Sequence, residues 1–289
     1  MMQYKQQNFR LAVVTLVLSG IFYLAACGIT LPPITEQPTE NQHLGKFVWF
    51  DLLTDDVPAA KKFYADIFAW DFDGSETGYT KILHKGAYIG GIIYSERLDE
   101  KVSESQWLSY LSVPDVDGAA EFVRQNGGKI IREVMDLDDR GRAAVVADPQ
   151  GAVFVLLKTS TGDPEDIKPR FGEWLWNELL TSDAENAASF YTSLVGYTQE
   201  AKELKAERMY YIMKYDDKPR AGIIKSPWDN VPPNWLPYIR VDDPRMVTDR
   251  VPKIGGKVIL APDPEIRNGT VAVIADPTGA ALAVQKWPM

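Results

Sequence analysis

Two acidic side chains lie inside short stretches that are otherwise apolar. Asp51 occurs in FVWFDLL and Glu178 in LWNELL, and each follows a tryptophan, Trp49 or Trp176, by two residues. Side chains two positions apart on a strand point to the same face, so each carboxylate is expected to share an apolar face with a large ring. Desolvation there favours the neutral acid, which suits a general acid or base. We therefore predict Asp51 and Glu178 as catalytic candidates.

Each acid has an expected tyrosine partner on a neighbouring strand. Strand alternation places Tyr110 with Asp51, and Tyr238 and Arg240 with Glu178. Apolar walls with a few oriented polar groups are typical of a small-molecule pocket, and a phenol could donate to a carbonyl or oxyanion. The predicted ligand-binding residues are Trp49, Tyr110, Trp176, Tyr238 and Arg240. Structural roles are the alternative, with the tryptophans filling a core and Glu178 forming an ion pair with Arg240.

Both stretches belong to an internal duplication. Residues 45–158 align with residues 172–286 across a polar linker, 159–170, with only small insertions. Each half begins with a strand, continues into a helix opened by Asp56 or Asp183, and then has short β runs and a second strand–helix start. The element order is therefore β-α-β-β-β, four times over, which predicts an α+β fold.

The recurring D-x-x-x-A-x-x-F-Y and A-D-P-x-G motifs resemble those of the vicinal oxygen chelate superfamily, which includes glyoxalase I, bleomycin-resistance proteins, extradiol dioxygenases and fosfomycin-resistance enzymes. The resemblance implies two tandem glyoxalase-like domains, residues 45–158 and 171–289. Each would be a curled mixed sheet with helices outside. It is specific for the fold and not for a reaction, because this fold carries many chemistries.

The same resemblance implies a divalent metal in the cleft, held by residues at fixed distances from the helix-opening acids and from the Asp of each A-D-P-x-G motif. The matching positions in this chain are Trp49, Leu108, Val155, Trp176, Leu236 and Ala283. None of these side chains is a metal ligand. We therefore expect no metal and predict no cofactor.

The amino terminus resembles a bacterial lipoprotein signal. A basic start and an apolar run lead to Leu-Ala-Ala-Cys, ending at Cys27. The resemblance implies that residues 1–26 are removed and that Cys27 is lipidated, which anchors the protein to the cell envelope. In a Gram-negative cell, Gly28 after the cysteine would favour the outer membrane, facing the periplasm. Residues 27–44 are rich in Pro, Thr and Gln, and we expect a flexible tether.

Charge excludes one class of partner. The chain has 31 Lys and Arg against 40 Asp and Glu, a formal charge of −9, and shows no basic cluster, so we do not expect a nucleic-acid partner. A single cysteine excludes an intrachain disulfide. The oligomeric state does not follow from the sequence.

Three functions remain in competition. We favour an envelope lipoprotein that binds a small organic molecule in a metal-free aromatic cleft. The first alternative is an enzyme of the lyase, dioxygenase or hydroxylase type, using Asp51 or Glu178 as acid or base, or an atypical metal site. The second is a structural or partner-binding envelope protein whose two clefts are filled by their own side chains.

Overall fold

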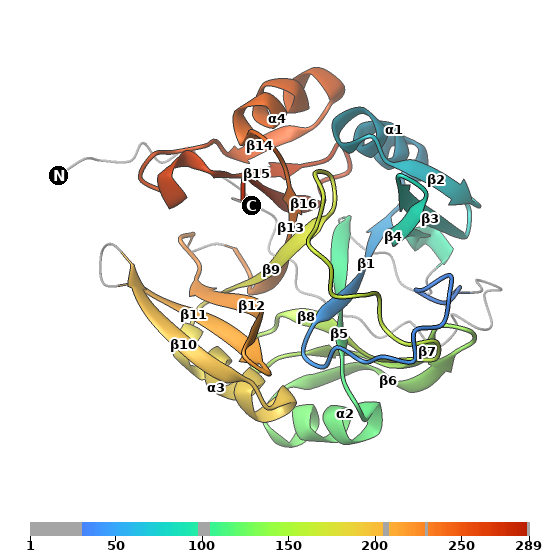
Figure 1. Ribbon diagram of the computed structural model, residues 1–289, viewed down its shortest axis with the longest axis vertical. Helices are drawn as coiled ribbons and strands as arrows, with labels where there is room; N and C mark the ends of the chain where they lie inside the picture. The colour runs from blue at the N-terminus through green and yellow to red at the C-terminus, as the bar shows by residue number, and fades with distance from the viewer. Residues whose placement is uncertain (1–30, 98–104, 205–207, 229–230, 288–289) are drawn as a thin grey trace.

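The computed structural model describes residues 31–97, 105–204, 208–228 and 231–287 (Figure 1). Two eight-stranded mixed sheets and four α-helices make up this part of the chain. The predicted α+β architecture of two tandem glyoxalase-like domains is confirmed. The predicted signal peptide and Cys27 lie outside the described residues.

The first sheet has the strand order β2-β3-β4-β1-β5-β8-β7-β6. β1 pairs in parallel with β4 and antiparallel with β5, so two four-stranded modules meet at the centre of the sheet. Its strands are β1 (Phe47–Thr54), β2 (Asp71–Gly74), β3 (Tyr79–His84), β4 (Ala87–Tyr94), β5 (Gln106–Ser112), β6 (Lys129–Leu137), β7 (Gly141–Ala147) and β8 (Val153–Thr159).

The second sheet repeats this order as β10-β11-β12-β9-β13-β16-β15-β14, with the same parallel and antiparallel pairings. Its strands are β9 (Trp174–Thr181), β10 (Thr198–Leu204), β11 (Arg208–Tyr215), β12 (Lys218–Lys225), β13 (Asn234–Arg240), β14 (Lys257–Leu260), β15 (Val271–Ala275) and β16 (Ala281–Gln285).

An aspartate opens each helix, as the sequence predicts for the first helix of each half. The carboxylate of Asp56 accepts the backbone N–H of Ala59 at 3.0 Å, and that of Asp183 accepts the N–H of Asn186 at 3.1 Å. Such caps satisfy donors that have no partner within the helix. The helices are α1 (Val57–Phe68), α2 (Val116–Gln125), α3 (Ala184–Val195) and α4 (Pro244–Arg250), the last extended by the 3₁₀ turn η3 (Val251–Ile254).

The helix-bearing faces of both sheets form one continuous core, which joins the two domains. α1 contacts η3, and α2 contacts α3, as Figure 1 shows at the top and bottom of the molecule. Aromatic rings cross the boundary: Phe47 lies 4.5 Å from Trp235, and Trp107 lies 5.0 Å from Trp174, between ring centroids. The concave face of each sheet carries a separate apolar cluster.

The turn at Asp148, which recurs at Asp276, has a second role that its motif did not reveal. One carboxylate oxygen accepts the N–H groups of Gln150 and Ala152, both at 2.9 Å, which is the expected turn chemistry. The other accepts the phenol of Tyr191 in the second domain at 3.1 Å. Trp235 in turn donates to the Tyr191 oxygen at 3.0 Å. The turn therefore also attaches one domain to the other.

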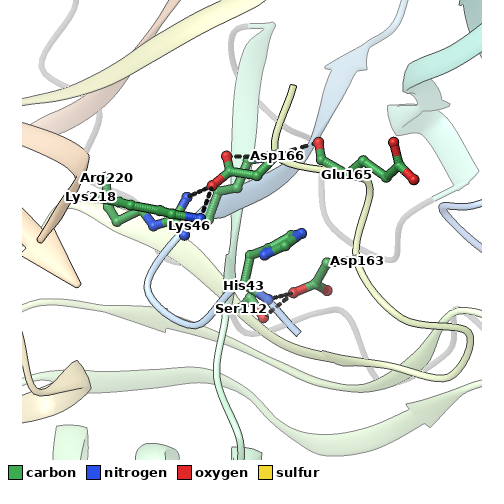
Figure 2. Close-up of polar contacts among 8 residues, drawn as sticks. All are labelled: His43, Lys46, Ser112, Asp163, Glu165, Asp166, Lys218 and Arg220. Atoms are coloured by element: carbon green, nitrogen blue, oxygen red, sulfur yellow. Dashed lines mark hydrogen bonds and ion pairs between the residues drawn. The ribbon is translucent and has the colours of Figure 1, made fainter. Parts of the chain in front are cut away.

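The linker between the domains is held by ion pairs (Figure 2). Asp166 accepts hydrogen bonds from Arg220 at 2.8 Å and from Lys218 at 3.4 Å, and its other oxygen lies 3.2 Å from the ammonium of Lys46. Burial by itself raises the pKa of Asp166, but the charges of Lys46 and Arg220 outweigh it and lower that pKa to about 2. Asp166 thus connects the first domain, the linker and the second domain.

The expected flexible tether is wrong for its described part. Residues 31–44 run along the linker and into the first domain, where Leu31 and Ile34 are almost fully buried. The Thr35 hydroxyl lies 2.7 Å from that of Thr161, and the N–H of Thr39 donates to the Thr161 carbonyl at 2.8 Å. Composition suggested flexibility because the segment lacks apolar periodicity, yet two aliphatic side chains are enough to dock it. We call residues 31–36 the strap.

No helix among the described residues combines the length and the apolar character needed to cross a membrane.

Acid should weaken the linker contacts in a defined pH range. The folded-state pKa of Asp166 lies below the ordinary value of about 3.9, so its ion pairs stabilise the fold above pH ~4, and this stability is lost as pH falls through about 2. We expect Asp166→Asn to lower the free energy of unfolding in urea at pH 6. The difference from the unsubstituted protein should shrink towards pH 2. A difference that stays constant over this range would contradict the assignment.

Candidate functional site

The first concave face is organised around the buried carboxylate of Asp51. Its Oδ1 accepts the phenol of Tyr79 at 2.8 Å and the indole N–H of Trp49 at 2.9 Å. Its Oδ2 accepts the phenol of Tyr110 at 2.7 Å and Nη1 of Arg140 at 2.6 Å. The predicted grouping of Trp49, Asp51 and Tyr110 is confirmed, and both oxygens of the carboxylate are fully engaged.

Arg140 supplies the charge that compensates Asp51. Both side chains are completely buried, and the guanidinium carbon lies 5.0 to 5.6 Å from the ring centroids of Tyr79, Trp49 and Tyr110. Burial by itself lowers the pKa of Arg140, but Asp51 together with the phenols of Tyr79 and Tyr110 outweighs it and raises that pKa above the ordinary value. Burial and the same carboxylate raise the pKa of Tyr110. The phenol stays protonated and donates, so the cluster is a closed ion pair.

The strap closes this first cleft. Leu31 and Ile34 join the apolar cluster of the concave face, and the backbone carbonyl of Pro32 accepts Nε of Arg140 at 3.2 Å. Asp51 is therefore shielded from solvent, and no substrate reaches it while the strap is in place. The structure does not support Asp51 as a catalytic residue in this state.

The second concave face repeats the arrangement around Glu178. Tyr238 donates its phenol to Oε1 at 2.7 Å, and Nη2 of Arg267 binds Oε2. Nη1 of Arg267 donates to the side-chain oxygen of Gln285 at 3.3 Å. Trp176 donates its indole N–H to the phenol of Tyr210, at 3.1 Å, instead of to the carboxylate. The predicted grouping of Trp176, Glu178 and Tyr238 is confirmed.

The second cleft is open. A cavity of about 2620 Å³ lies against its concave face, and the side chain of Arg267 remains 29% exposed, whereas that of Arg140 is fully buried. Trp228 from the loop before β13 packs on the same apolar cluster and rims the cavity. Most of the other walls are apolar or aromatic: Leu175, Trp176, Leu180, Tyr210, Ile224, Leu236, Tyr238, Ile259, Leu260, Ile266, Val271, Val273 and Ala281.

The two arginines and two tyrosines were not found by the sequence analysis. Arg140 and Arg267 are 127 residues apart, whereas the sequence on either side of them aligns at 128, so the two arginines do not match in the aligned halves. Arg140 lies in the turn before β7 and Arg267 in the turn before β15. Each reaches its carboxylate only in the folded protein, because the two residues are far apart in the chain. Tyr79 on β3 and Tyr210 on β11 are displaced in the alignment by small insertions, which hid their equivalence.

A glycine faces each carboxylate on the neighbouring strand. A side chain at Gly91 would place its Cβ 2.0 Å from the Tyr79 hydroxyl, and one at Gly222 would place it 2.1 Å from the Tyr210 hydroxyl. Both distances are far inside van der Waals contact. Glycine at these two positions therefore gives the phenols the space that they occupy.

The structural alternative for Glu178, an ion pair with Arg240, has the wrong partner. Arg240 lines the cavity, but its Nη1 donates to the carbonyl of Pro169 at 2.7 Å, and its guanidinium lies 4.8 Å from the ring centroid of Phe171. It ties the end of the linker to β13, and Arg267 takes the place beside Glu178 instead. The sequence could not distinguish the two arginines because the register of the turn before β15 depends on tertiary packing.

The donor set does not fit the metal that the fold family implies. Trp49, Leu108 and Val155 occupy one concave face and Trp176, Leu236 and Ala283 the other, and none of them supplies a metal ligand. The carboxylates nearby are bound to arginines. Within the described ranges no group of three or more His, Cys, Asp or Glu side chains lies close enough to hold an ion.

Comparison with known proteins identifies relatives of one superfamily along most of the chain. A model of the glyoxalase/bleomycin resistance protein/dioxygenase superfamily matches residues 46–156. The chain is 32% identical over 243 residues to the Mycobacterium tuberculosis protein named "Putative glyoxylase CFP32", covering 82% of this chain and 93% of that one. It is 28% identical over 258 residues to the anthracycline biosynthesis protein DnrV of Streptomyces peucetius, covering 83% and 92%.

Solved structures share the fold at low sequence identity. The Mn(II)-bound glyoxalase from Novosphingobium aromaticivorans superposes with a TM-score of 0.59 at 14% identity, covering 84% of this chain and 82% of that one. The 2,2',3-trihydroxybiphenyl 1,2-dioxygenase of Sphingomonas wittichii gives 0.56 at 12% identity, covering 84% and 91%. These likenesses establish the architecture alone.

The two arginines should differ in their contribution to stability. Arg140→Gln leaves a fully buried carboxylate without its charge partner, which costs about 3–5 kcal/mol. Arg267→Gln disrupts a pair in which the arginine is 29% exposed and the Glu178 carboxylate 5%, so the loss should be smaller. Urea denaturation of both variants measures the difference. Equal losses would show that the two clefts are equally closed in solution.

Proposed function

Because the chain belongs to the glyoxalase/bleomycin resistance protein/dioxygenase superfamily, we propose that it binds a small organic molecule in its second cleft without using a metal. The observation that carries this proposal is the open cavity above the Glu178–Arg267 pair. Aromatic and aliphatic side chains form most of its walls, and charged side chains, among them Glu178, Arg240 and Arg267, also line it. Such a combination is typical of small-molecule sites.

The polar groups beside Glu178 indicate what the ligand presents. Arg267 donates hydrogen bonds from Nη2 to Glu178 and from Nη1 to Gln285. Among the described contacts its Nε makes no hydrogen bond. An oxygen acceptor on the ligand, such as a carbonyl, would complete this guanidinium. The rings of Trp176, Tyr210 and Tyr238 would then lie against the ligand body, and flat aromatic molecules pack well on such rings.

Two features narrow the size and shape of the ligand. The cavity of about 2620 Å³, which also borders residues 105–108 of the first domain, has room for a polycyclic molecule. Two Streptomyces relatives are named as anthracycline biosynthesis proteins, which supports a polycyclic aromatic ketone as the ligand class. A hydroxylated anthraquinone is a suitable probe of this class.

The enzymatic alternative depends on Glu178, since the strap shields Asp51. One oxygen of Glu178 accepts the Tyr238 phenol and the other is bound to Arg267. A general base must exchange a proton with the substrate, and these two partners already take one acceptor site on each oxygen. Orientation of a bound molecule is therefore the better supported role.

The structural alternative has support only in the first domain. There the concave face is filled by Leu31 and Ile34. Among the described residues no side chain fills the second cleft, where a cavity of about 2620 Å³ remains.

Binding of 1,8-dihydroxyanthraquinone, followed by tryptophan fluorescence quenching, tests the proposal. We expect Arg267→Met to weaken binding about tenfold or more, because a charged hydrogen bond contributes about 1.5–3 kcal/mol. Arg142→Met is the matched control, since Arg142 forms surface ion pairs with Asp117 and Asp136 away from the cleft. Equal affinities of the two variants, or no binding by the unsubstituted protein, would contradict the proposal.

We also propose that Cys27 is lipidated and that the protein is anchored in a bacterial envelope. The supporting observation is the sequence alone: a basic start, an apolar run and Leu-Ala-Ala before the chain's one cysteine. Anchoring by acyl chains needs no spanning helix.

Metabolic labelling with palmitate tests the anchor. The full-length chain should incorporate label and sediment with membranes. Cys27→Ser should lose the label completely, because no second thiol is present to accept it. Label that persists in Cys27→Ser, or an unlabelled full-length chain, would refute lipidation at this residue.

A further inference from the structure

The two clefts contain the same five side-chain types in equivalent places. A tryptophan, a carboxylate, two tyrosines and an arginine meet on each concave face, as Trp49, Asp51, Tyr79, Tyr110 and Arg140 in the first and as Trp176, Glu178, Tyr210, Tyr238 and Arg267 in the second. The clefts differ in what covers these groups. A cavity lies above the second set, and the strap lies above the first.

The strap occupies the first cleft in the manner of a ligand. Leu31 and Ile34 are 1% and 2% exposed and lie among the aliphatic and aromatic side chains of the concave face. Between them, the Pro32 carbonyl accepts Nε of Arg140 at 3.2 Å. Nε is the same donor that remains without a described partner in Arg267. The first cleft therefore binds, in the strap, an oxygen acceptor that lies between two apolar side chains.

We propose that the first cleft is a second binding site, for carbonyl-bearing apolar molecules, and that the strap is its intramolecular competitor. The inference rests on the contacts of the first cleft and holds whether or not the second cleft binds a ligand. A molecule that enters must displace Leu31 and Ile34 from the apolar walls. It must also replace the Pro32 carbonyl at Arg140.

Few polar contacts hold the strap in the first cleft. Beyond its two buried side chains it is held by the Pro32 carbonyl and by the contact between the Thr35 and Thr161 hydroxyls, at 2.7 Å. Because it is covalently linked, it competes at an effective concentration on the order of millimolar. A ligand binds only those molecules in which the strap has left the first cleft. The apparent affinity is therefore the affinity of the open cleft multiplied by the fraction of molecules that are open.

Substitutions that weaken the strap should uncover the site. In the full chain, Leu31→Ser with Ile34→Ser removes the apolar anchors without changing any residue of the concave sheet face. We expect 1,8-dihydroxyanthraquinone to bind with one additional equivalent and to quench more tryptophan fluorescence, since Trp49 lines the opened cleft. Ile167→Ser is the matched control, because Ile167 is 64% exposed in the linker, and it should bind the probe as the unsubstituted protein does.

A second substitution separates the two clefts. Ala281→Trp places an indole in the second cleft, where Ala281 lines the cavity. Combined with the strap substitutions, it should leave one equivalent of bound probe; with the strap intact, it should leave none or only weak binding. If only the strap variants bind the probe, the second-cleft function fails while this inference stands.

Two results would overturn the inference. The first is an unchanged number of probe sites in a strap variant whose circular dichroism matches that of the unsubstituted protein. If that variant does not fold, Leu31→Ala replaces it, because it shortens one side chain and adds no polar group. In the Ala281→Trp background, Leu31→Ala should tighten binding of the probe at the first cleft severalfold. The second result that would overturn the inference is an unchanged affinity of this variant.

Discussion

Each sheet places a carboxylate on its concave face among apolar side chains, and that charge has to be compensated. Transfer of an unpaired carboxylate from water into such surroundings is prohibitively unfavourable. In the first domain Arg140, two phenols and an indole N–H together satisfy Asp51. The turn that carries the arginine, the strand that carries each tyrosine and the glycine that gives the phenol room all serve this requirement.

Burial of the helix-bearing faces against each other leaves the concave faces free. The core runs through both domains, and aromatic pairs such as Phe47 with Trp235 cross the boundary. Tyr191 adds a hydrogen bond from the second domain to the Asp148 turn of the first. The duplication thus gives one body with two clefts, and each cleft is free to diverge.

The clefts have diverged in access more than in chemistry. Both retain the ion pair and its aromatic neighbours, but Arg140 is fully buried under the strap while Arg267 faces a cavity. Asp51 and Glu178, equivalent in the sequence, therefore have different environments. Solvent does not reach the Asp51–Arg140 pair, whereas the Arg267 side chain remains 29% exposed beside the cavity.

The sequence by itself determined the duplication, the α+β modules and the grouping of Trp49, Asp51 and Tyr110, because period-two alternation and helix caps are local properties. It also determined that the family's metal positions lack metal ligands. Only the tertiary structure decided that Arg267, and not Arg240, pairs with Glu178, and that residues 31–36 fill the first cleft. Both depend on contacts between segments far apart in the chain, whose partners no local pattern specifies.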